Sequence, residues 1–185
     1  MSVSKRVAKA LDAIISDDPE DALFQICAAI EKTARLEGRS KGRKGYKQFI
    51  SENVPIICGV GLGHALAGLK FRISHPDLPV SEDGTASIAD IVYHACRCAL
   101  YHSAELSDLV EFTTNKVGST TTGKLLLPKM IVSGLILAVV CSPENRHANS
   151  EHKGYVRVRG QTYTIKDCWG QRARVLERLT AAEAV

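Results

Sequence analysis

The feature that most constrains the fold of this chain is an apolar run of twelve residues, Met130 to Cys141. A helix that spans a bilayer needs roughly 20 such residues, so the run is too short to cross a membrane. A helix that is apolar on all sides belongs in a protein core. We therefore expect a buried core helix here, opened by Pro128.

Apolar residues at helical spacing predict several other helices in the chain. In the second of them, Asp18 can cap the first turn and Pro19 suits the first helical position. Its early acidic residues, Glu20 and Asp21, favour the positive end of the helix dipole. The expected helices, besides the core helix, cover residues 4–15, about 19–37, a segment from about 46, about 87–112 and about 171–182.

The pattern changes toward the C-terminus, where residues 155–160 and 161–166 alternate between apolar and polar side chains. This period of two around a Gly-Gln pair predicts a β-hairpin. Glycine-rich or polar segments between the periodic ones predict loops. These loops are expected over residues 38–45, 74–84 and 113–124.

The chain has 185 residues, no internal repeat and no long linker, which favours one domain over 1–185. We expect a mainly α fold, a helical bundle over about 19–142 with a small C-terminal β-hairpin and a terminal helix over about 154–182. Gly59, Gly61 and Gly63 lack the spacing of a dinucleotide-binding fingerprint. They are better explained by close packing between helices.

The formal net charge of +4 and the pI near 8.7 permit an anionic partner without requiring one. The positive charge is concentrated in one Gly-rich loop with the helix that follows it, and on the expected hairpin. Such side chains contact RNA through its phosphates rather than through its sequence. The candidate RNA contacts are Arg39, Lys41, Arg43, Lys44, Lys47, Arg157 and Arg159.

The six cysteines do not resemble a disulfide framework, because four of them lie in apolar or helical segments of a chain larger than disulfide-dependent miniproteins. Buried free thiols are the better interpretation. The first residues are basic but no apolar stretch follows them, so no secretory signal is evident. We expect a cytoplasmic protein that does not associate with membranes.

The densest polar cluster lies on the helix expected over 87–112, where Arg97 interrupts an apolar pattern. A buried guanidinium needs a partner, and Glu31 or Glu105 can provide one. Tyr93 and Tyr101, four residues on either side, can flank its plane. His102 follows five residues later, about 140° around an ideal helix, so the two side chains converge only if the helix bends or both bind one ligand.

An arginine and a histidine are enough, in principle, for RNA cleavage without a metal. A histidine near neutral pKa can move the proton of a ribose 2′-hydroxyl. A forked, permanently charged guanidinium suits the charge that develops on the phosphate.

The run Arg97-Cys-Ala-Leu-Tyr-His102 resembles the Arg-x4-6-His signature of the HEPN superfamily, the higher eukaryotes and prokaryotes nucleotide-binding domains. The helix around Phe24 to Arg35, followed by a basic loop and Tyr46-Lys-Gln-Phe-Ile-Ser, also resembles such proteins. The likeness covers about residues 20–145. Cys98 stands where the family commonly has a polar residue.

The resemblance implies a helical bundle that forms a homodimer in which two such motifs face one another. Catalytic members are endoribonucleases that need no metal or other cofactor, and many act as toxins or in antiviral defence. Arg97 would then position the scissile phosphate and His102 would act as general base or acid, with RNA as substrate and an antitoxin or defence-system protein as a possible partner. The supporting residues would be Tyr93, Cys98, Tyr101, Glu31 and Glu105.

Three other interpretations stay open. The first is a non-catalytic module of the same fold that binds RNA, a nucleotide or a partner protein. The second is a zinc site, because His94, Cys98 and His102 share a helical stripe, although no fourth ligand is evident. The third is a thiol nucleophile at Cys96 or Cys98, for which no orienting residue is evident. Glu31 and Arg35, four residues apart, are expected to form a helix-face ion pair.

Overall fold

The computed structural model describes residues 1–65, 68–73, 78–79, 81–98, 110–148 and 152–181. The apolar run forms the helix α7 (Met130–Cys141), in which every residue except Met130 is buried. The prediction of a buried core helix is confirmed. The chain is mainly helical with small sheets, and none of the helices it describes has the length and apolar character to span a membrane.

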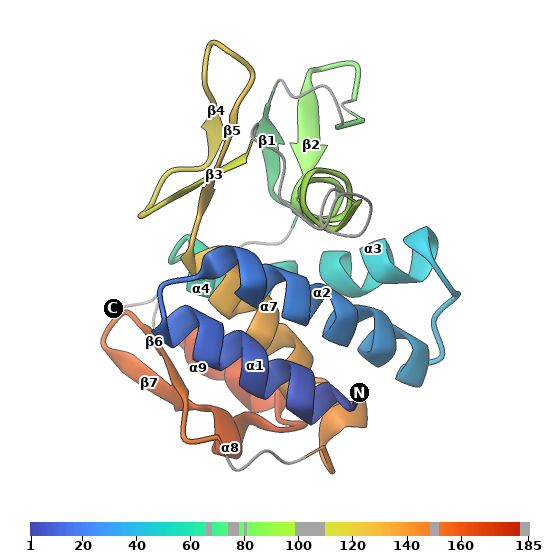
Figure 1. Ribbon diagram of the computed structural model, residues 1–185, viewed down its shortest axis with the longest axis vertical. Coiled ribbons are helices and arrows are strands. Elements are labelled where there is room, and N and C mark those ends of the chain that lie inside the picture. The colour runs from blue at the N-terminus through green and yellow to red at the C-terminus, as the bar shows by residue number, and fades with distance from the viewer. Residues whose placement is uncertain (66–67, 74–77, 80, 99–109, 149–151, 182–185) are drawn as a thin grey trace.

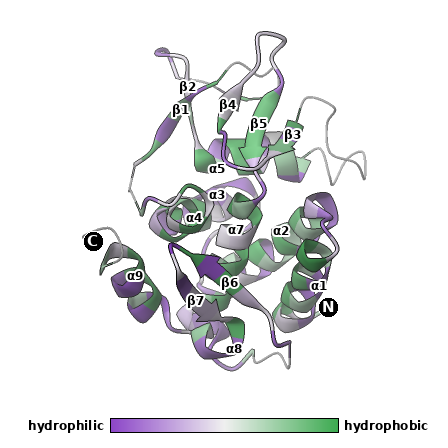
Figure 2. Ribbon diagram, turned by 90° about the vertical axis from the view of Figure 1, so that its left-hand side faces the viewer, coloured by the Kyte–Doolittle hydropathy of each residue, from purple (hydrophilic) through white to green (hydrophobic). Residues whose placement is uncertain are grey.

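Helices from both ends of the chain surround α7 (Figure 1). The first two, α1 (Val3–Ile15) and α2 (Pro19–Leu36), form an antiparallel pair against it. Asp18 accepts a hydrogen bond from the backbone N–H of Asp21, as expected of a cap at the start of α2. Figure 2 shows hydrophobic and hydrophilic residues on different sides of α1 and α2, as expected for helices that cover a core.

The helix α3 (Arg43–Glu52) begins earlier than the sequence predicts, at Arg43 instead of near Tyr46. Gly42 precedes it with a φ of 73°, a conformation that glycine adopts without strain. The next helix, α4 (Val54–Gly61), packs along α7.

The contact between α4 and α7 depends on glycine. A Cβ placed on Gly134 would lie 2.5 Å from the carbonyl oxygen of Ile57, and one on Gly61 would lie 2.3 Å from Cδ1 of Ile131. Both distances are shorter than a normal contact, so larger residues would force the helices apart. The predicted close packing of helices is confirmed at Gly61, whereas a Cβ on Gly59 would make only ordinary contacts.

The segment between α4 and α7 contains strands that the sequence analysis missed. Strand β1 (Lys70–Arg72) pairs antiparallel with β2 (Thr85–Ser87). A three-stranded sheet has the order β3-β5-β4, in which β3 (Val110–Thr113) runs parallel to β5 (Leu125–Pro128) and β4 (Gly118–Ser119) runs antiparallel to it. Together with the helix described next, these strands form the upper part of Figure 1.

The prediction of one helix over 87–112 is therefore wrong at its C-terminal end, where β3 begins at Val110. A short turn, α5 (Ile88–Asp90), continues into a π-helix, η1 (Ile91–Cys98), and residues 99–109 lie outside the described residues. Residues 110–113 form a strand because Val, Phe and Thr favour extended backbone and pair with β5. The loop expected over 113–124 and the helix start expected at Pro128 are also wrong, since β4 lies within the former and Pro128 ends β5.

The C-terminal part packs on the lower side of the helices (Figure 1). After the 3-10 turn η2 (Pro143–Asn145), strands β6 (Tyr155–Val158) and β7 (Gln161–Thr164) pair antiparallel. Arg159 and Gly160 connect them with φ of 48° and 76°, the positive values that a tight two-residue turn requires. The short helix α8 (Ile165–Cys168) and the helix α9 (Arg172–Ala181) end the described chain.

All six cysteines are free thiols, as predicted. Five are buried and Cys98 is half-buried. The thiols of Cys27 and Cys141 are so enclosed that burial raises the pKa of each to about 12.

Candidate functional site

The guanidinium of Arg97 is held by one carboxylate and two aromatic rings. Its Nη2 donates to Oε2 of Glu31 on α2 at 3.0 Å. Its central carbon lies 5.4 Å from the ring centroid of Tyr46 on α3 and 5.1 Å from that of Tyr93 on η1. Three separate elements therefore fix the orientation of this side chain, 17% of which is exposed.

The expected ion-pair partner Glu31 and the expected neighbour Tyr93 are both confirmed as contacts of Arg97. Tyr46 was missed as a contact of Arg97, although it belongs to the segment that carries the family resemblance. No signal in the spacing could have found it, because Tyr46 reaches Arg97 only through the packing of α3 against η1.

The π-helical geometry of η1 bears on the motif. A π-helix closes i→i+5 hydrogen bonds and is often found at functional sites. Arg97 lies in the last turn of η1, which ends at Cys98. His102 itself lies outside the described residues, as do Tyr101 and Glu105.

Glu31 joins Arg97 to a second arginine. Its other oxygen, Oε1, accepts from Nη2 of Arg35 at 2.5 Å, which confirms the expected helix-face pair. Burial opposes ionisation of Glu31, but the hydrogen bonds from Arg97 and Arg35 outweigh it and lower the pKa of this carboxyl. Glu31 is therefore ionised at neutral pH, and it raises the pKa of Arg97 despite the burial of that guanidinium.

A surface pocket of about 480 Å³ adjoins this cluster on α2. Glu31 lies in its wall together with Lys32 and Arg35, both of which are exposed. The wall of the pocket thus carries two cations and one carboxylate. The balance is positive, which suits an anionic ligand. The remaining lining residues are Ala28 and Leu36.

Of the two candidate thiol nucleophiles, Cys96 and Cys98, the structure excludes Cys96. Cys96 is fully buried, and burial raises the pKa of its thiol far above neutrality. A nucleophilic cysteine needs a lowered pKa and access to substrate. Cys98, which is half-buried, follows Arg97 directly.

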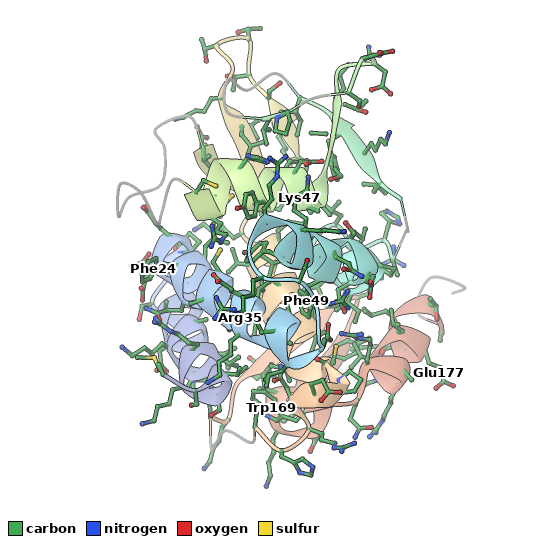
Figure 3. All side chains as sticks on the ribbon, turned by 90° about the vertical axis from the view of Figure 1, so that its right-hand side faces the viewer. Phe24, Arg35, Lys47, Phe49, Trp169 and Glu177 are labelled. Carbon is green, nitrogen blue, oxygen red and sulfur yellow. The ribbon has the colours of Figure 1, made fainter. Side chains whose placement is uncertain are left out.

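The candidate RNA contacts of the basic loop divide into two groups. Arg39 and Lys47 are held by acidic side chains. Arg39 pairs with Glu37 and Glu52. Lys47, which is labelled on α3 in Figure 3, pairs with Asp90. These two cations support the fold. The other three, Lys41, Arg43 and Lys44, are exposed.

The pair between Lys47 and Asp90 also anchors the start of the helix that carries Arg97. Asp90 forms a capping box with Ser87, whose hydroxyl accepts from the Asp90 N–H at 3.1 Å. Burial opposes ionisation of Asp90, but the Lys47 ammonium and the Ser87 hydroxyl outweigh it and lower the pKa of the carboxyl.

The two candidates on the β6–β7 pair do not belong to the Arg97 cluster. Arg157 lies 5.6 Å from the ring centroid of Tyr155, and Nη2 of Arg159 lies 3.2 Å from Nδ1 of His64. Strands β6 and β7 lie at the lower end of the molecule, whereas η1 lies below the upper strands (Figure 1).

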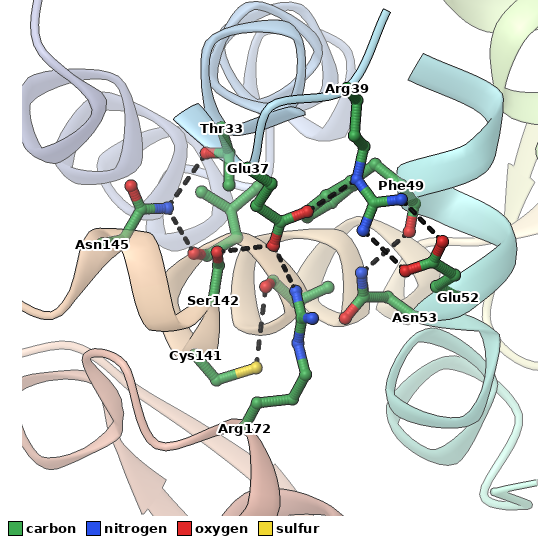
Figure 4. A network of polar contacts seen from close by, with 12 residues as sticks. Thr33, Glu37, Arg39, Phe49, Glu52, Asn53, Cys141, Ser142, Asn145 and Arg172 are labelled. Carbon is green, nitrogen blue, oxygen red and sulfur yellow. Dashed lines mark hydrogen bonds and ion pairs between the residues drawn. The ribbon is translucent and has the colours of Figure 1, made fainter. Parts of the chain in front are cut away.

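A second charged cluster, which the sequence analysis did not predict, lies at the C-terminal end of α2 (Figure 4). Glu37 accepts from Nε of Arg39 at 2.7 Å, from Nη2 of Arg172 at 2.6 Å and from Oγ of Ser142 at 2.7 Å. Only 8% of the Glu37 side chain is exposed. Beside it Asn145 donates to Oγ1 of Thr33 and to the carbonyl oxygen of Val139. This cluster joins α2, α7 and α9, and none of its residues lines the pocket beside Glu31.

The metal interpretation finds no support in the part of the chain that the structure describes, where no three His, Cys, Asp or Glu side chains are grouped to hold an ion. Its stripe of His94, Cys98 and His102 includes one residue outside that part.

The comparison with known proteins gives one match. A family model described as Rv1289 matches residues 2–185, almost the entire chain. No curated protein and no solved structure matches the chain.

Proposed function

The chain belongs to the Rv1289 family, and for this member we propose the activity of an endoribonuclease of the HEPN type that needs no metal. The observation that carries the proposal is the fixed orientation of Arg97 between Glu31, Tyr46 and Tyr93. An arginine held in this way is preorganised, so it need not be ordered when substrate binds.

The charge around the pocket supports an RNA substrate. Lys32 and Arg35 line the pocket beside Glu31, and their ammonium and guanidinium groups suit phosphate oxygens. Glu31 has a lowered pKa, which makes it a poor proton acceptor. We assign it the role of holding Arg97 and Arg35, and assign the proton transfer to His102.

The proposed reaction is transesterification. His102 removes the proton of a ribose 2′-hydroxyl, and the 2′-oxygen attacks the adjacent phosphorus. The bond from phosphorus to the 5′-oxygen breaks, and a proton returns to that oxygen. The products are a cyclic phosphate and a 5′-hydroxyl, and Arg97 stabilises the negative charge that develops on the phosphate.

Cleavage assays in excess chelator test the proposal. Wild type should cleave RNA, and Arg97→Ala and His102→Ala should each reduce the rate by about 100-fold or more. Arg174→Ala, at an exposed arginine on α9, is the matched control and should retain the wild-type rate. Circular dichroism should show that each variant is folded. Equal cleavage by wild type and both site variants would remove the assigned site, and loss of cleavage on chelation alone would favour the zinc interpretation.

Two further parts of the proposal follow the family resemblance. We propose that the active form is a cytoplasmic homodimer in which two Arg97–His102 motifs face one another, and that an antitoxin or defence-system protein regulates it. Light scattering of the purified protein measures the oligomeric state directly. A monomer that still cleaves RNA would contradict the composite site.

The ion pair between Arg97 and Glu31 favours a second candidate, a module of the same fold that binds RNA without cleaving it. An arginine bound to a carboxylate can recognise a phosphate without stabilising a transition state. Binding without cleavage by the wild type in the assay above would favour this candidate.

A further inference from the structure

We infer that Arg43 is a stacking subsite for an unpaired nucleobase, and that the substrate of the site is therefore single-stranded RNA. The inference rests on the proposed function and deepens it by naming the substrate class.

Arg43 ends a row of alternating rings and guanidinium groups. The row starts in the core at Tyr46, which is 1% exposed. It continues to Arg97, 5.4 Å from the Tyr46 ring centroid, and to Tyr93, whose ring centroid lies 5.1 Å from Arg97. The central carbon of Arg43 lies 6.0 Å from the ring centroid of Tyr93. Arg43 is therefore the last member of the row, and Tyr46 is the first. The row thus connects the proposed phosphate-binding arginine to a surface arginine by direct contacts.

The position of Arg43 leaves it able to accept a ring on its outer side. Arg43 is exposed, and no acid pairs with it in the part of the chain that the structure describes. A planar guanidinium stacks on aromatic faces, which an ammonium does not do. A nucleobase on Arg43 would continue the alternation of rings and cations by one position.

The other cations of the loop are less suited to this role. Arg39 and Lys47 are held by acids and support the fold. Lys41 and Lys44 are exposed but lack a planar group, so they suit phosphates rather than bases.

A stacking subsite selects for single strands. Proteins that read RNA through its bases mostly bind unpaired nucleotides, whose faces are free to stack on aromatic rings or on arginine. In a duplex both faces of each base are covered by neighbouring pairs. A base that binds Arg43 next to a phosphate that binds Arg97 must therefore be unpaired.

The test measures RNA binding in the His102→Ala background, so that cleavage does not consume the probe. Fluorescence anisotropy would give the Kd for a labelled 12-nucleotide single strand, for the same strand annealed to its complement, and for a strand of equal length with abasic sites. Arg43→Lys keeps the charge and removes the plane. Arg174→Lys makes the same change at an exposed arginine on α9 and serves as the matched control.

We expect Arg43→Lys to weaken binding of the single strand by about tenfold, the usual scale of one lost base stack. The same variant should change binding of the abasic strand less than twofold, and Arg174→Lys should leave all three Kd values unchanged. The duplex should bind more weakly than the single strand. An unchanged Kd for the single strand in Arg43→Lys, or equal binding of single strand and duplex by the parent, would overturn the inference.

Cleavage by the protein with His102 intact separates this inference from the proposed function. If wild type cleaves RNA while Arg43→Lys binds the single strand normally, the stacking subsite is wrong and the nuclease stands. If nothing is cleaved but Arg43→Lys shows the tenfold loss, the subsite stands and the nuclease is wrong. No binding of any RNA would overturn both.

Discussion

Glu31 and Glu37 lie six residues apart, Glu31 in the second half of α2 and Glu37 at its C-terminal end. They have the same kind of partners but different surroundings. Each accepts hydrogen bonds from two arginines, one close in the sequence and one far from it. Glu31 binds Arg35 and Arg97, and Glu37 binds Arg39 and Arg172.

The difference lies in burial and in the other partners. Glu31 lies in the wall of a surface pocket, and its distant arginine contacts two tyrosine rings. Glu37 is enclosed, and it accepts an additional hydrogen bond from Ser142 at the end of α7. The Glu37 cluster joins helices, whereas the Glu31 cluster presents an oriented cation beside a pocket.

One motif, a carboxylate between two arginines, can thus serve stability or function according to its exposure. A buried cluster contributes to folding because breaking it strands charges away from water. The Glu31 cluster is more open, with 22% of the Glu31 side chain and 55% of the Arg35 side chain exposed, so it should contribute less to folding. Its main effect is to orient Arg97.

The largest effect is expected from Glu37→Ala. This substitution leaves Arg39 and Arg172 without their shared carboxylate and should lower the free energy of unfolding by about 3 kcal/mol. Glu31→Ala should lower it less, by about 1 kcal/mol, because Arg35 is largely exposed and Arg97 keeps its contacts with two aromatic rings. Urea titrations followed by circular dichroism measure both, and equal losses would break the contrast between the two clusters.

A smaller effect is expected from Ser142→Ala. The buried hydroxyl donates to Oε1 of Glu37 at 2.7 Å, and loss of such a bond should cost about 2 kcal/mol of unfolding free energy. Ser133→Ala is the matched control. Ser133 is buried on α7 but its hydroxyl has no hydrogen bond among the described residues, so this change should be within about 0.5 kcal/mol of wild type. Similar losses in the two variants would show that Ser142 acts by packing alone.

Glu31→Gln tests whether the charge of Glu31 orients Arg97. The amide keeps the shape of the side chain but removes the charge that orients Arg97 and Arg35. RNA cleavage should fall by about tenfold, as expected for a charged hydrogen bond that positions a reacting group. The urea midpoint should stay close to that of wild type. A loss of stability without a loss of cleavage would place Glu31 with Glu37 among the structural residues.

The smallest effect concerns Glu52, which is bound to Arg39 at the outer edge of the Glu37 cluster. The hydrogen bond from Arg39 lowers the pKa of this carboxyl from its ordinary value of 4.5 to about 2. Because the folded pKa is the lower one, the stabilisation is complete above pH 4.5 and is lost as the pH falls toward 2. The side chain is 47% exposed, so we expect less than about 1 kcal/mol.

Unfolding free energies of wild type and Glu52→Gln between pH 2 and pH 7 check this sign. The difference between the two proteins should shrink as the pH falls. A difference that grows toward acid would contradict the assignment.

Local signals in the sequence predicted much of the helical part. The amphipathic spacing of α1 and α2, the cap at Asp18 and the apolar run of α7 each act within a few residues. The strands between α4 and α7 were missed because they are short and pair across the chain. Leu125–Pro128, for example, pairs with Val110–Thr113 on one side and with Gly118–Ser119 on the other.

The two charged clusters also differ in whether their contacts are local in the sequence or span the chain. The pair of Glu31 with Arg35 was predictable from its spacing of four, and Glu31 was one of two acids proposed for Arg97. Arg172 lies 135 residues from Glu37, and no periodicity links positions so far apart. The Glu37 cluster therefore became visible only once the packing of α9 was known.

The central position of α7 has a consequence for the order in which the chain is made. When α7 leaves the ribosome, α1, α2 and α4 already exist to cover it, but α8 and α9 have not been synthesised. One side of this largely apolar helix stays uncovered until the last part of the chain is made, and exposed apolar surface of this kind promotes aggregation. A premature stop after η2 would thus yield a polypeptide that holds every residue of the Arg97 site and still fails to accumulate in soluble form.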